Sequence, residues 1–323
     1  MIRTIRFLAL ALACFVTPAL AQSDYPNRVV RVVVPYAAGG PADILARLVG
    51  QRLSDRLGQQ FVIENKPGAG GSIGAGHVAR NTPADGYTLM MAPVGIMAIN
   101  PWINASLPYD PVRDFQPITL IAKSPFVLAV NPGVPAHSVA EFVAYGKTAP
   151  GKIKIANPGI GTGQHLAAVY FSNVAGIESV QVPYRGSALG TTDLLAGVVD
   201  AQFDLAPLLP YIEAGKLRPL AVTAPQRLAS MPNVPTIAES GFPGFEIEAW
   251  NGLVAPAGTP MPIVRKLQQA IAEILASNEM QSNLRGQGYE PGGKSPEEFG
   301  AFIASELEKY RDIVRVAKLP PTN

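Results

Sequence analysis

The chain contains very few cysteine and histidine residues, which excludes several kinds of chemistry. It has one cysteine and three histidines among 323 residues. Cys14 lies in the N-terminal apolar segment, so a chain that loses this segment has no thiol and no disulfide. His77, His137 and His165 do not show the paired spacing of a metal site. We therefore expect no metal and no cofactor, and a stability that comes from apolar burial and hydrogen bonds.

The sequence also lacks an excess of charge of either sign. Its formal net charge is +2, and Arg3 and Arg6 in the N-terminal segment account for this excess. The rest of the chain therefore has no basic surplus with which to neutralise phosphates, which argues against nucleic acid as a partner. A ligand has to be recognised by local groups, and the length suggests two domains of ordinary size.

No hydrophobic run is long enough to cross a membrane. The N-terminal apolar stretch, Phe7–Val16, has about ten residues, whereas a spanning helix needs about twenty. Two arginines before it and a small-residue segment ending at Ala21 complete the pattern of a secretory signal in residues 1–21. This pattern disfavours two alternatives, a membrane anchor and a lipoprotein signal at Cys14. We therefore expect export to the periplasm, with cleavage after Ala21.

Short β-branched runs alternate with helical patterns in the first part of the chain. Strands are predicted at Val29–Val34, Phe61–Glu64 and Tyr87–Met90, and helices at Ala42–Leu57 and near Ser72–Arg80. Such alternation indicates a parallel sheet that is covered by helices.

The pattern restarts after Ile118, which indicates a second α/β domain. Its predicted elements are strands near Phe126–Val130, Ile153–Ala156 and Val180–Val182, and helices near Val139–Lys147, Gln164–Asn173 and Thr192–Ala196. An extended segment near Phe245–Leu253 precedes helices at Ile263–Ala276 and Pro296–Lys318, the last introduced by a Ser295-x-x-Glu298 capping box.

These last helices are expected to return to the first domain. Lobe 1 would then comprise residues 22–122 and 248–323, and lobe 2 residues 123–247. Two chain crossings, near 118–124 and 244–252, would form a hinge between the lobes. Periodicity alone is also consistent with a simple tandem of two domains.

Three glycine-rich loops each lie between a predicted strand and a predicted helix. They are Gly39-Gly40, Gly68–Ser72 and Asn157–His165. Glycines leave backbone amides open beside the positive end of a helix dipole, which suits a carboxylate. One such loop alone would favour a tight turn over an anion site, but the repetition favours anion binding.

Several side chains near these loops have two interpretations. Asp43 either caps free amides near the N3 position of its helix or contacts the ligand. His165 either contacts the ligand or bonds to a neighbouring loop. Arg185 either clamps a carboxylate or remains solvated at the rim. Asp204 either accepts a hydrogen bond from a ligand amine or hydroxyl or bridges loops.

Enzyme motifs are incomplete or out of context. The loop at Gly68–Ser72 lacks the ending of a phosphate-binding P-loop and the spacing of a dinucleotide fold. Gly70–Gly74 matches a nucleophile elbow centred on Ser72. An elbow requires a sharp turn from strand to helix, whereas several residues including Pro67 separate Ser72 from the predicted strand. A secreted serine hydrolase is therefore the alternative rather than the main hypothesis.

A series of short segments along the chain recurs in one known family. They are Tyr25-Pro26, Val34–Gly40 with Asp43, Glu64–Gly71, Asp85–Leu89, Leu107–Pro111, Gly159–Thr162 with His165, Val182–Gly186, Asp193–Gly197 and Leu253–Pro260. Each segment alone is weak evidence for this family, but the segments together are specific to it. In this order they resemble the Bug family, the periplasmic receptors of tripartite tricarboxylate transport systems, over nearly the whole chain after residue 21.

The resemblance implies a two-domain α/β periplasmic binding protein fold, type II-like, with the ligand cleft between its lobes. It also implies that loop amides, hydroxyls and water hold a carboxylate-bearing solute. By position, the expected contacts are Gly39, Gly40, Asp43, Ala69, Gly70, Asn157, Gly161, Thr162, His165, Arg185 and Asp204. Ala42 stands where the family often has Thr, and Asn157 where it often has Ser or Thr. Ligands in the family include dicarboxylates, tricarboxylates, amino acids and aromatic acids.

We therefore expect a monomeric solute-binding receptor rather than an enzyme. It should close two lobes around a small organic acid and deliver it to a membrane permease. A sensory receptor, which presents the ligand-bound state to a signalling partner, shares the same cleft and is a further alternative. Backbone amides of the first two loops and Thr162 should contribute more to recognition than any single positive side chain, because Arg185 is the only obvious basic candidate.

Overall fold

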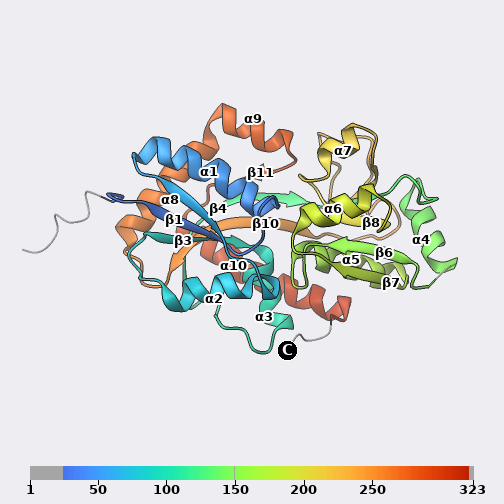
Figure 1. Cartoon of the computed structure of the whole chain (residues 1–323), viewed down its shortest axis with the longest axis horizontal. Coiled ribbons are helices and arrows are strands. Elements are labelled where there is room, and N and C mark those ends of the chain that lie inside the picture. The colour runs from blue at the N-terminus through green and yellow to red at the C-terminus, as the bar shows by residue number, and fades with distance from the viewer. Residues whose placement is uncertain (1–24, 149, 320–323) are drawn as a thin grey trace, which may run out of the picture.

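The chain folds around two separate β-sheets (Figure 1). The computed structural model describes residues 25–148 and 150–319. The first sheet has six strands and the second has five, each with helices on both faces, so the molecule consists of two α/β lobes. No helix in the described ranges is long and apolar enough to cross a membrane. The expected signal segment, 1–21, lies outside these ranges.

Lobe 1 is built on the six-stranded sheet. In chain order its strands are β1 (Val30–Val34), β2 (Phe61–Asn65), β3 (Thr88–Pro93), β4 (Phe115–Pro125), β10 (Glu248–Pro256) and β11 (Glu290–Pro291). Strand β1 lies between β2 and β3 and is parallel to both, whereas β10 lies antiparallel between β3 and β4. The four valines of β1 are all buried, which explains the nearly continuous apolar run in its sequence.

Helices cover both faces of this sheet. They are α1 (Pro41–Leu57), α2 (Ser72–Asn81), α3 (Asn100–Ile103), α8 (Met261–Ala276), α9 (Asn278–Gly286) and α10 (Pro296–Ala317). Residues of α1, α8 and α9 form one apolar core with the sheet, and residues of α2 and α10 belong to the core on the other face. Two short helical turns, η1 (Ala69–Gly71) and η2 (Gly95–Ile99), precede α2 and α3.

The start of α10 confirms the predicted capping box. The hydroxyl oxygen of Ser295 accepts a hydrogen bond from the amide of Glu298 at 3.2 Å, and the Glu298 carboxylate accepts one from the amide of Ser295 at 2.8 Å. Two otherwise unpaired amides are thus satisfied where the helix begins.

Lobe 2 is built on the five-stranded sheet. Its strands are β5 (Val127–Val130), β6 (Ile153–Asn157), β7 (Ser179–Pro183), β8 (Ala201–Asp204) and β9 (Arg218–Val222), and its helices are α4 (Val139–Thr148), α5 (Gly163–Ala175), α6 (Ser187–Leu195) and α7 (Leu209–Glu213). The strands lie in the order β7-β6-β8-β5-β9. Helix α6 begins at Ser187, whereas the sequence predicted a helix from Thr192, because glycine and two threonines weaken its helical signal.

Two segments of chain cross between the lobes. Strand β4 continues directly into β5, and the chain returns from β9 to β10. The buried Thr223 joins the crossings, because its hydroxyl donates to the carbonyl oxygen of Ile247 at 2.6 Å and accepts from the amide of Phe126 at 2.8 Å. The segments predicted to be crossings, 118–124 and 244–252, fall mostly on β4 and β10, so strands rather than loops join the lobes.

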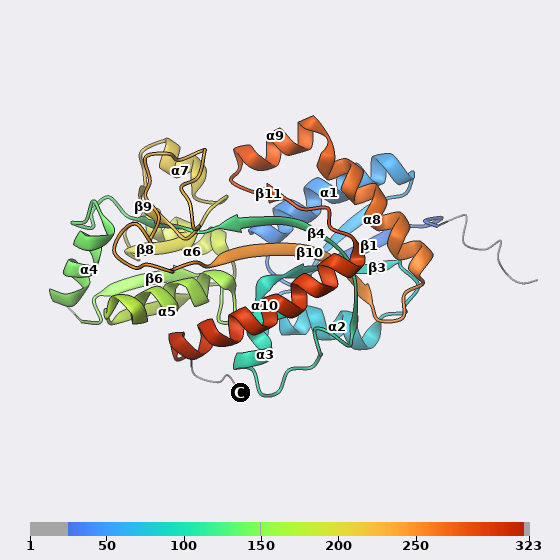
Figure 2. The same ribbon diagram turned by 180° about the vertical axis from the view of Figure 1, so that it is seen from behind.

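Helix α10 extends from lobe 1 onto lobe 2 beside these crossings (Figure 2). Near its end, the carbonyl oxygen of Ala317 accepts a hydrogen bond from Asn173 Nδ2 of α5 at 2.7 Å. Along its length, the carbonyl oxygen of Leu307 accepts one from Trp102 Nε1 of α3 at 3.0 Å. The C-terminal helix therefore contacts both lobes.

Candidate ligand-binding cleft

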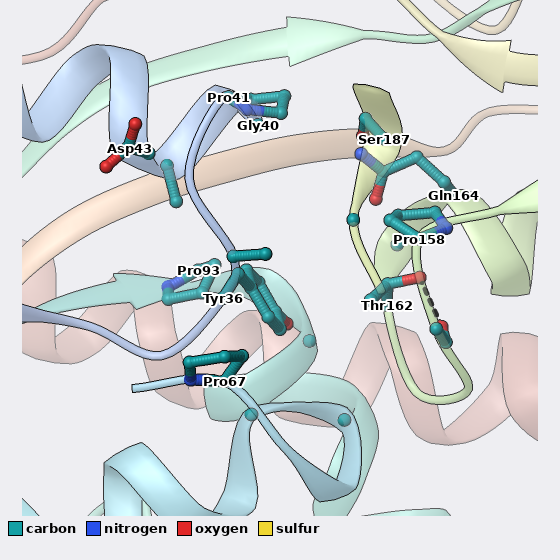
Figure 3. Close-up of a pocket in the computed structure, with 18 of the residues that line it drawn as sticks. Tyr36, Gly40, Pro41, Asp43, Pro67, Pro93, Pro158, Thr162, Gln164 and Ser187 are labelled. Carbon is teal, nitrogen blue, oxygen red and sulfur yellow. Dashed lines mark hydrogen bonds between the residues drawn. The ribbon is translucent and has the colours of Figure 1, made fainter. Parts of the chain in front are cut away.

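A cavity of about 500 Å³ opens between the two lobes (Figure 3). Lobe 1 contributes residues 36–37, 40–43, 67–71 and 93–95, lobe 2 contributes 158–159, 162–164 and 184–187, and β10 contributes 249–251. All three glycine-rich loops predicted from the sequence reach it. Of the predicted contacts, those in its lining are Gly40, Asp43, Ala69, Gly70, Thr162 and Arg185, and those outside are Gly39, Asn157, Gly161, His165 and Asp204.

Asp43 braces the loop between β1 and α1. Its Oδ2 accepts from the amide of Gly39 and from Arg47 Nε, both at 3.0 Å, and its Oδ1 accepts from Arg47 Nη2 at 2.9 Å and from Asn65 Nδ2 at 3.0 Å. Burial by itself would raise the pKa of Asp43, but the hydrogen bonds from Arg47, Gly39 and Asn65 hold the pKa below its usual value. These bonds favour the capping interpretation of Asp43 and occupy the Gly39 amide.

The start of α1 leaves other amides for a ligand. Gly40 is the N-cap and Pro41 is the first helical residue. Within residues 25–148 and 150–319, the N–H groups of Gly40 and Ala42 have no hydrogen-bond partner. Helix N-termini carry a partial positive charge, so these two donors suit an anion.

The loop before α2 is a run of left-handed backbone. The φ angles of Gly68, Ala69, Gly70 and Gly71 are 132°, 47°, 61° and 92°. Ala69 is strained, because a left-handed conformation costs a residue with a Cβ about 1–2 kcal/mol. The amides of Ala69 and Gly70 have no partner within the described part of the chain. Successive amides in turns of this kind form concave sites for anions.

Thr162 caps helix α5 on the lobe 2 side. Its hydroxyl donates to the carbonyl oxygen of Gly159 at 2.7 Å and accepts from the amide of His165 at 3.3 Å. The single hydroxyl proton is therefore engaged within the loop. Thr162 lines the cavity, but its Oγ1 can serve a ligand only as an additional acceptor.

His165 and Asn157 lie behind this loop rather than in the cavity lining. Burial lowers the pKa of His165 to about 4, so the imidazole is neutral near neutral pH. The side-chain oxygen of Asn157 accepts from the amide of Gly159 at 3.1 Å. Both residues shape the third glycine-rich loop from beneath.

The loop between β7 and α6 brings Arg185 and Ser187 to the cavity. The Ser187 hydroxyl donates to Asp204 Oδ2 at 2.6 Å, and Gln164 Nε2 approaches the same oxygen at 3.4 Å. Asp204 is only 1% exposed. Burial raises the pKa of this carboxyl, against hydrogen bonds from Ser187, the Leu205 amide and Gln164. Asp204 therefore acts on the cavity through other side chains.

The lobes touch each other on both sides of the cavity. A Cβ built on Gly70 of lobe 1 would overlap the carbonyl oxygen of Ile160 in lobe 2. At the other side, a Cβ on Gly186 of lobe 2 would lie 3.1 Å from the Cβ of Ala37 in lobe 1. The absence of side chains at these glycines allows the two walls to approach.

Strand β10 forms the floor of the cleft with Ala249, Trp250 and Asn251. Trp250 is 1% exposed, and its Nε1 donates to Glu306 Oε2 of α10 at 2.8 Å. Its ring packs edge-on against Phe302, with the centroids 5.3 Å apart. The floor is thereby fixed to the helix that contacts both lobes.

Ser72 does not have the surroundings of a catalytic nucleophile. It is buried at the start of α2 and outside the cavity lining, and its hydroxyl accepts from Asn100 Nδ2 at 3.4 Å. In the described ranges no histidine or carboxylate is hydrogen-bonded to it, and no group of acidic, histidine or cysteine side chains could hold a metal ion.

Sequence reasoning missed several lining residues. Tyr36, Gln164, Ser187 and Trp250 all reach the cavity. The first three lie next to predicted contacts or in predicted loops, and this proximity in sequence could have indicated that they line the cavity. Trp250 lies on the predicted extended segment, but nothing in the periodicity indicates that this segment passes beneath a cleft.

Comparisons with known proteins agree on one family. A family model described as tripartite tricarboxylate transporter family receptor matches residues 45–319. The structure "R. palustris Rpa4515 with adipate" is 39% identical, with a TM-score of 0.90 over 92% of this chain and 100% of that one. The periplasmic binding protein BugD is 34% identical, with a TM-score of 0.87 over 92% and 99%. MatC from Rhodopseudomonas palustris with bound malate is 32% identical, with a TM-score of 0.86 over 90% and 100%.

Proposed function

The chain belongs to the tripartite tricarboxylate transporter receptor family, and on that premise we propose that it captures a carboxylate-bearing organic acid in the cleft between its lobes. It then delivers this acid to the membrane permease of such a transporter. Two related structures contain adipate and malate, which are both carboxylic acids. The function is binding and transfer rather than catalysis.

The observation that carries the proposal is the set of unpaired amides in the lobe 1 wall. Gly40, Ala42, Ala69 and Gly70 each have an N–H group without a partner in the described ranges. The first two lie at the start of α1, and the other two lie in the left-handed loop before α2. A carboxylate between these loops would accept hydrogen bonds from donors that the fold has already oriented.

We further propose that the lobes, 22–122 with 248–323 and 123–247, close around the acid. The exported chain acts as a monomer in the periplasm after cleavage behind Ala21. Contacts from both lobes support closure, since only closure brings them onto one ligand. Small-angle scattering of the exported chain should show a smaller radius of gyration with bound acid. An unchanged radius with several acids that stabilise the protein would contradict closure.

Thermal denaturation with a ligand panel tests the binding function. The panel should hold mono-, di- and tricarboxylates, amino acids and aromatic acids, with neutral sugars and cations as controls. At a hundred times its dissociation constant a ligand should stabilise the native state by about 2.7 kcal/mol. If sugars or cations raise the melting temperature and no carboxylate does, the proposal is wrong.

A substitution that removes a single amide donor tests the site itself. Ala42→Pro deletes one unpaired N–H in the first turn of α1, where proline is tolerated. Loss of a hydrogen bond to a charged group should cost about 1.5–3 kcal/mol of binding free energy. Glu297→Pro is the matched control, because residue 297 also follows a proline in the first turn of a helix and lies outside the cavity lining. Equal affinity in both variants would contradict the assignment.

A further inference from the structure

The lobe 2 wall contributes polar side chains to the cavity. Ser187 at the start of α6 and Gln164 in the first turn of α5 both line the cavity. Figure 3 shows the Gln164 side chain extending from α5 to end beside Ser187, across the cleft from Tyr36 and Gly40. Both side chains converge on the same carboxylate oxygen, Oδ2 of Asp204.

The hydrogen bond to Asp204 fixes what Ser187 can offer. A serine hydroxyl has one proton and two lone pairs. The proton is donated to Asp204 at 2.6 Å, and Ser187 is only 2% exposed, so its hydroxyl has little freedom to turn. The Ser187 oxygen is therefore presented to the cleft as an acceptor. Gln164 donates through Nε2 to Asp204 at 3.4 Å, which leaves its Oε1 as a second acceptor.

Both carboxylate oxygens of Asp204 accept hydrogen bonds. Besides Ser187 and Gln164, the amide of Leu205 donates to its Oδ1 at 2.9 Å. No lysine, arginine or histidine forms an ion pair with Asp204 in residues 25–148 and 150–319. From lobe 1, the buried Tyr289 interacts electrostatically with Asp204, which contributes to the raised pKa of Tyr289. A buried carboxyl group without a positive partner thus lies directly behind the two acceptors.

We propose that Ser187 and Gln164 select an acid that carries a hydrogen-bond donor, a hydroxyl or an ammonium group, in addition to its carboxylate. Asp204 is the positioning residue that orients both acceptors. This inference rests on the proposed function, since it assumes that the carboxylate binds to the lobe 1 amides. The ligand then spans the cleft from donors on lobe 1 to acceptors on lobe 2, and its donor group meets oxygens that a bare methylene or a second carboxylate would leave unsatisfied.

Calorimetric titration of the exported chain with matched ligand sets tests the proposal. Each set has one carbon skeleton with hydrogen, hydroxyl or ammonium beside a carboxylate: succinate, malate and aspartate; glutarate, 2-hydroxyglutarate and glutamate; adipate and its 2-hydroxy and 2-amino forms. All titrations use one mildly alkaline buffer, because burial raises the pKa of Asp204. In the set that fits the cleft, the hydroxy acid should bind about 3- to 10-fold tighter than the unsubstituted acid, and the amino acid about 10-fold or more if ammonium is the preferred donor.

Three variants and one control locate the effect. Ser187→Ala should reduce this ratio to near one while the unsubstituted acid still binds. Thr192→Ala is the control, because its hydroxyl lies on the same helix, donates to the carbonyl oxygen of Ala188 at 3.0 Å and is outside the cavity. In Asp204→Asn the new side-chain amide can donate to the Ser187 oxygen, which frees the Ser187 hydroxyl proton. This variant should therefore also reduce the ratio. If Asp204 had only a structural role, the variant would instead bind all ligands more weakly to the same extent. If Asp204→Asn does not fold, Ser187→Ala and Gln164→Met decide.

The outcomes separate this inference from the proposed function. Equal or tighter binding of the unsubstituted acids by the wild-type chain overturns the inference and leaves the receptor function standing. An unchanged ratio in Ser187→Ala also overturns it. If no carboxylate binds, either from these sets or from the wider ligand panel, the proposed function fails as well.

Discussion

The two walls of the cleft are built from different parts of the polypeptide. The lobe 1 wall consists largely of backbone in loops of glycine, alanine and proline, with amides that have no partner among the residues the structure describes. The lobe 2 wall adds the polar side chains of Thr162, Gln164 and Ser187, which are hydrogen-bonded to other groups of lobe 2. Backbone amides bind any carboxylate in the same way, whereas side chains differ between proteins of the same fold. Lobe 1 thus suits the feature that all ligands share, and lobe 2 suits the feature that distinguishes one ligand.

Acidification should affect the lobe 2 side most, through His165. Its pKa is lowered to about 4 in the folded protein, so the folded state resists protonation while the unfolded state accepts it. The contribution of neutral His165 to the free energy of unfolding is fully present above about pH 6.5. It is lost as the pH falls towards 4, which lowers the free energy of unfolding by about 3 kcal/mol in total. Urea unfolding from neutral to acidic pH measures this loss.

The control for this experiment is a histidine outside the cleft. His165→Asn should flatten the decline of stability with pH, whereas His137→Asn, on the exposed surface, should not. The change of the free energy of unfolding with pH is compared between the variants. The absolute free energy of unfolding is not compared, because either substitution can change it. Equal slopes in the wild-type chain and His165→Asn would contradict the prediction.

A methyl group on Gly70 should disturb the approach of the two walls. Gly70→Ala would place its Cβ against the carbonyl oxygen of Ile160, and overpacking of this kind costs about 1–3 kcal/mol. We expect a loss of affinity of about 5- to 150-fold for the cognate acid, measured by calorimetry. Gly58→Ala is the matched control, because Gly58 has a φ of 72° and no atom lies within 4 Å of the position that a Cβ would take there. Equal affinity loss in both would mean that the walls do not constrain each other here.

Thr162 should matter for the stability of lobe 2 more than for binding. Thr162→Ala removes the N-cap of α5 and should lower the free energy of unfolding by about 1 kcal/mol. Thr162→Ser keeps both hydrogen bonds and should restore the stability. A more than tenfold loss of affinity in Thr162→Ala with unchanged stability would instead indicate a direct ligand contact.

The smallest effect is expected for Ala69 in the lobe 1 wall. Ala69→Gly relieves left-handed strain of about 1–2 kcal/mol but adds about 0.5–1 kcal/mol of chain entropy to the unfolded state. The net result should be a stabilisation of about 0.5 kcal/mol with little change in affinity, because the amide remains. Ala38→Gly, where φ is not positive, should destabilise slightly. A large loss of affinity in Ala69→Gly would show that lobe 1 also reads the ligand through a side chain.

Local sequence signals predicted the scaffold of the lobe 1 wall well. The strand at Val30–Val34, the helix from Pro41 and the loop at Gly68–Ser72 are each set by neighbours in sequence, through β-branched runs, helical spacing and glycines. The family and the two-lobed periplasmic binding protein fold expected from the sequence are confirmed by the comparisons. The residue-level contacts and the lobe boundaries stay predictions.

The lobe 2 wall was harder to predict, because its partners are distant in the chain. Gln164 and Ser187 lie 40 and 17 residues from Asp204, and no local pattern reveals that the three side chains meet. Asp204 was expected to contact a ligand or to bridge loops, and its hydrogen bonds favour the bridging interpretation. Helix α6 was placed five residues late for a related reason, since tertiary contacts rather than propensity stabilise its first turn.

The floor of the cleft gives the protein an intrinsic optical probe. The chain has two tryptophans, and Trp102 is 39% exposed on α3, whereas Trp250 is almost completely shielded from solvent beneath the ligand space. Since Trp250 lies on a strand that crosses between the lobes and is hydrogen-bonded to α10, its indole emission should respond both to the arrival of a solute and to a rearrangement of the crossing. Occupancy of the cleft can therefore be followed in real time without any attached dye. The reference is Trp250→Phe, in which the emission of Trp250 is absent and Trp102 is the only tryptophan that fluoresces.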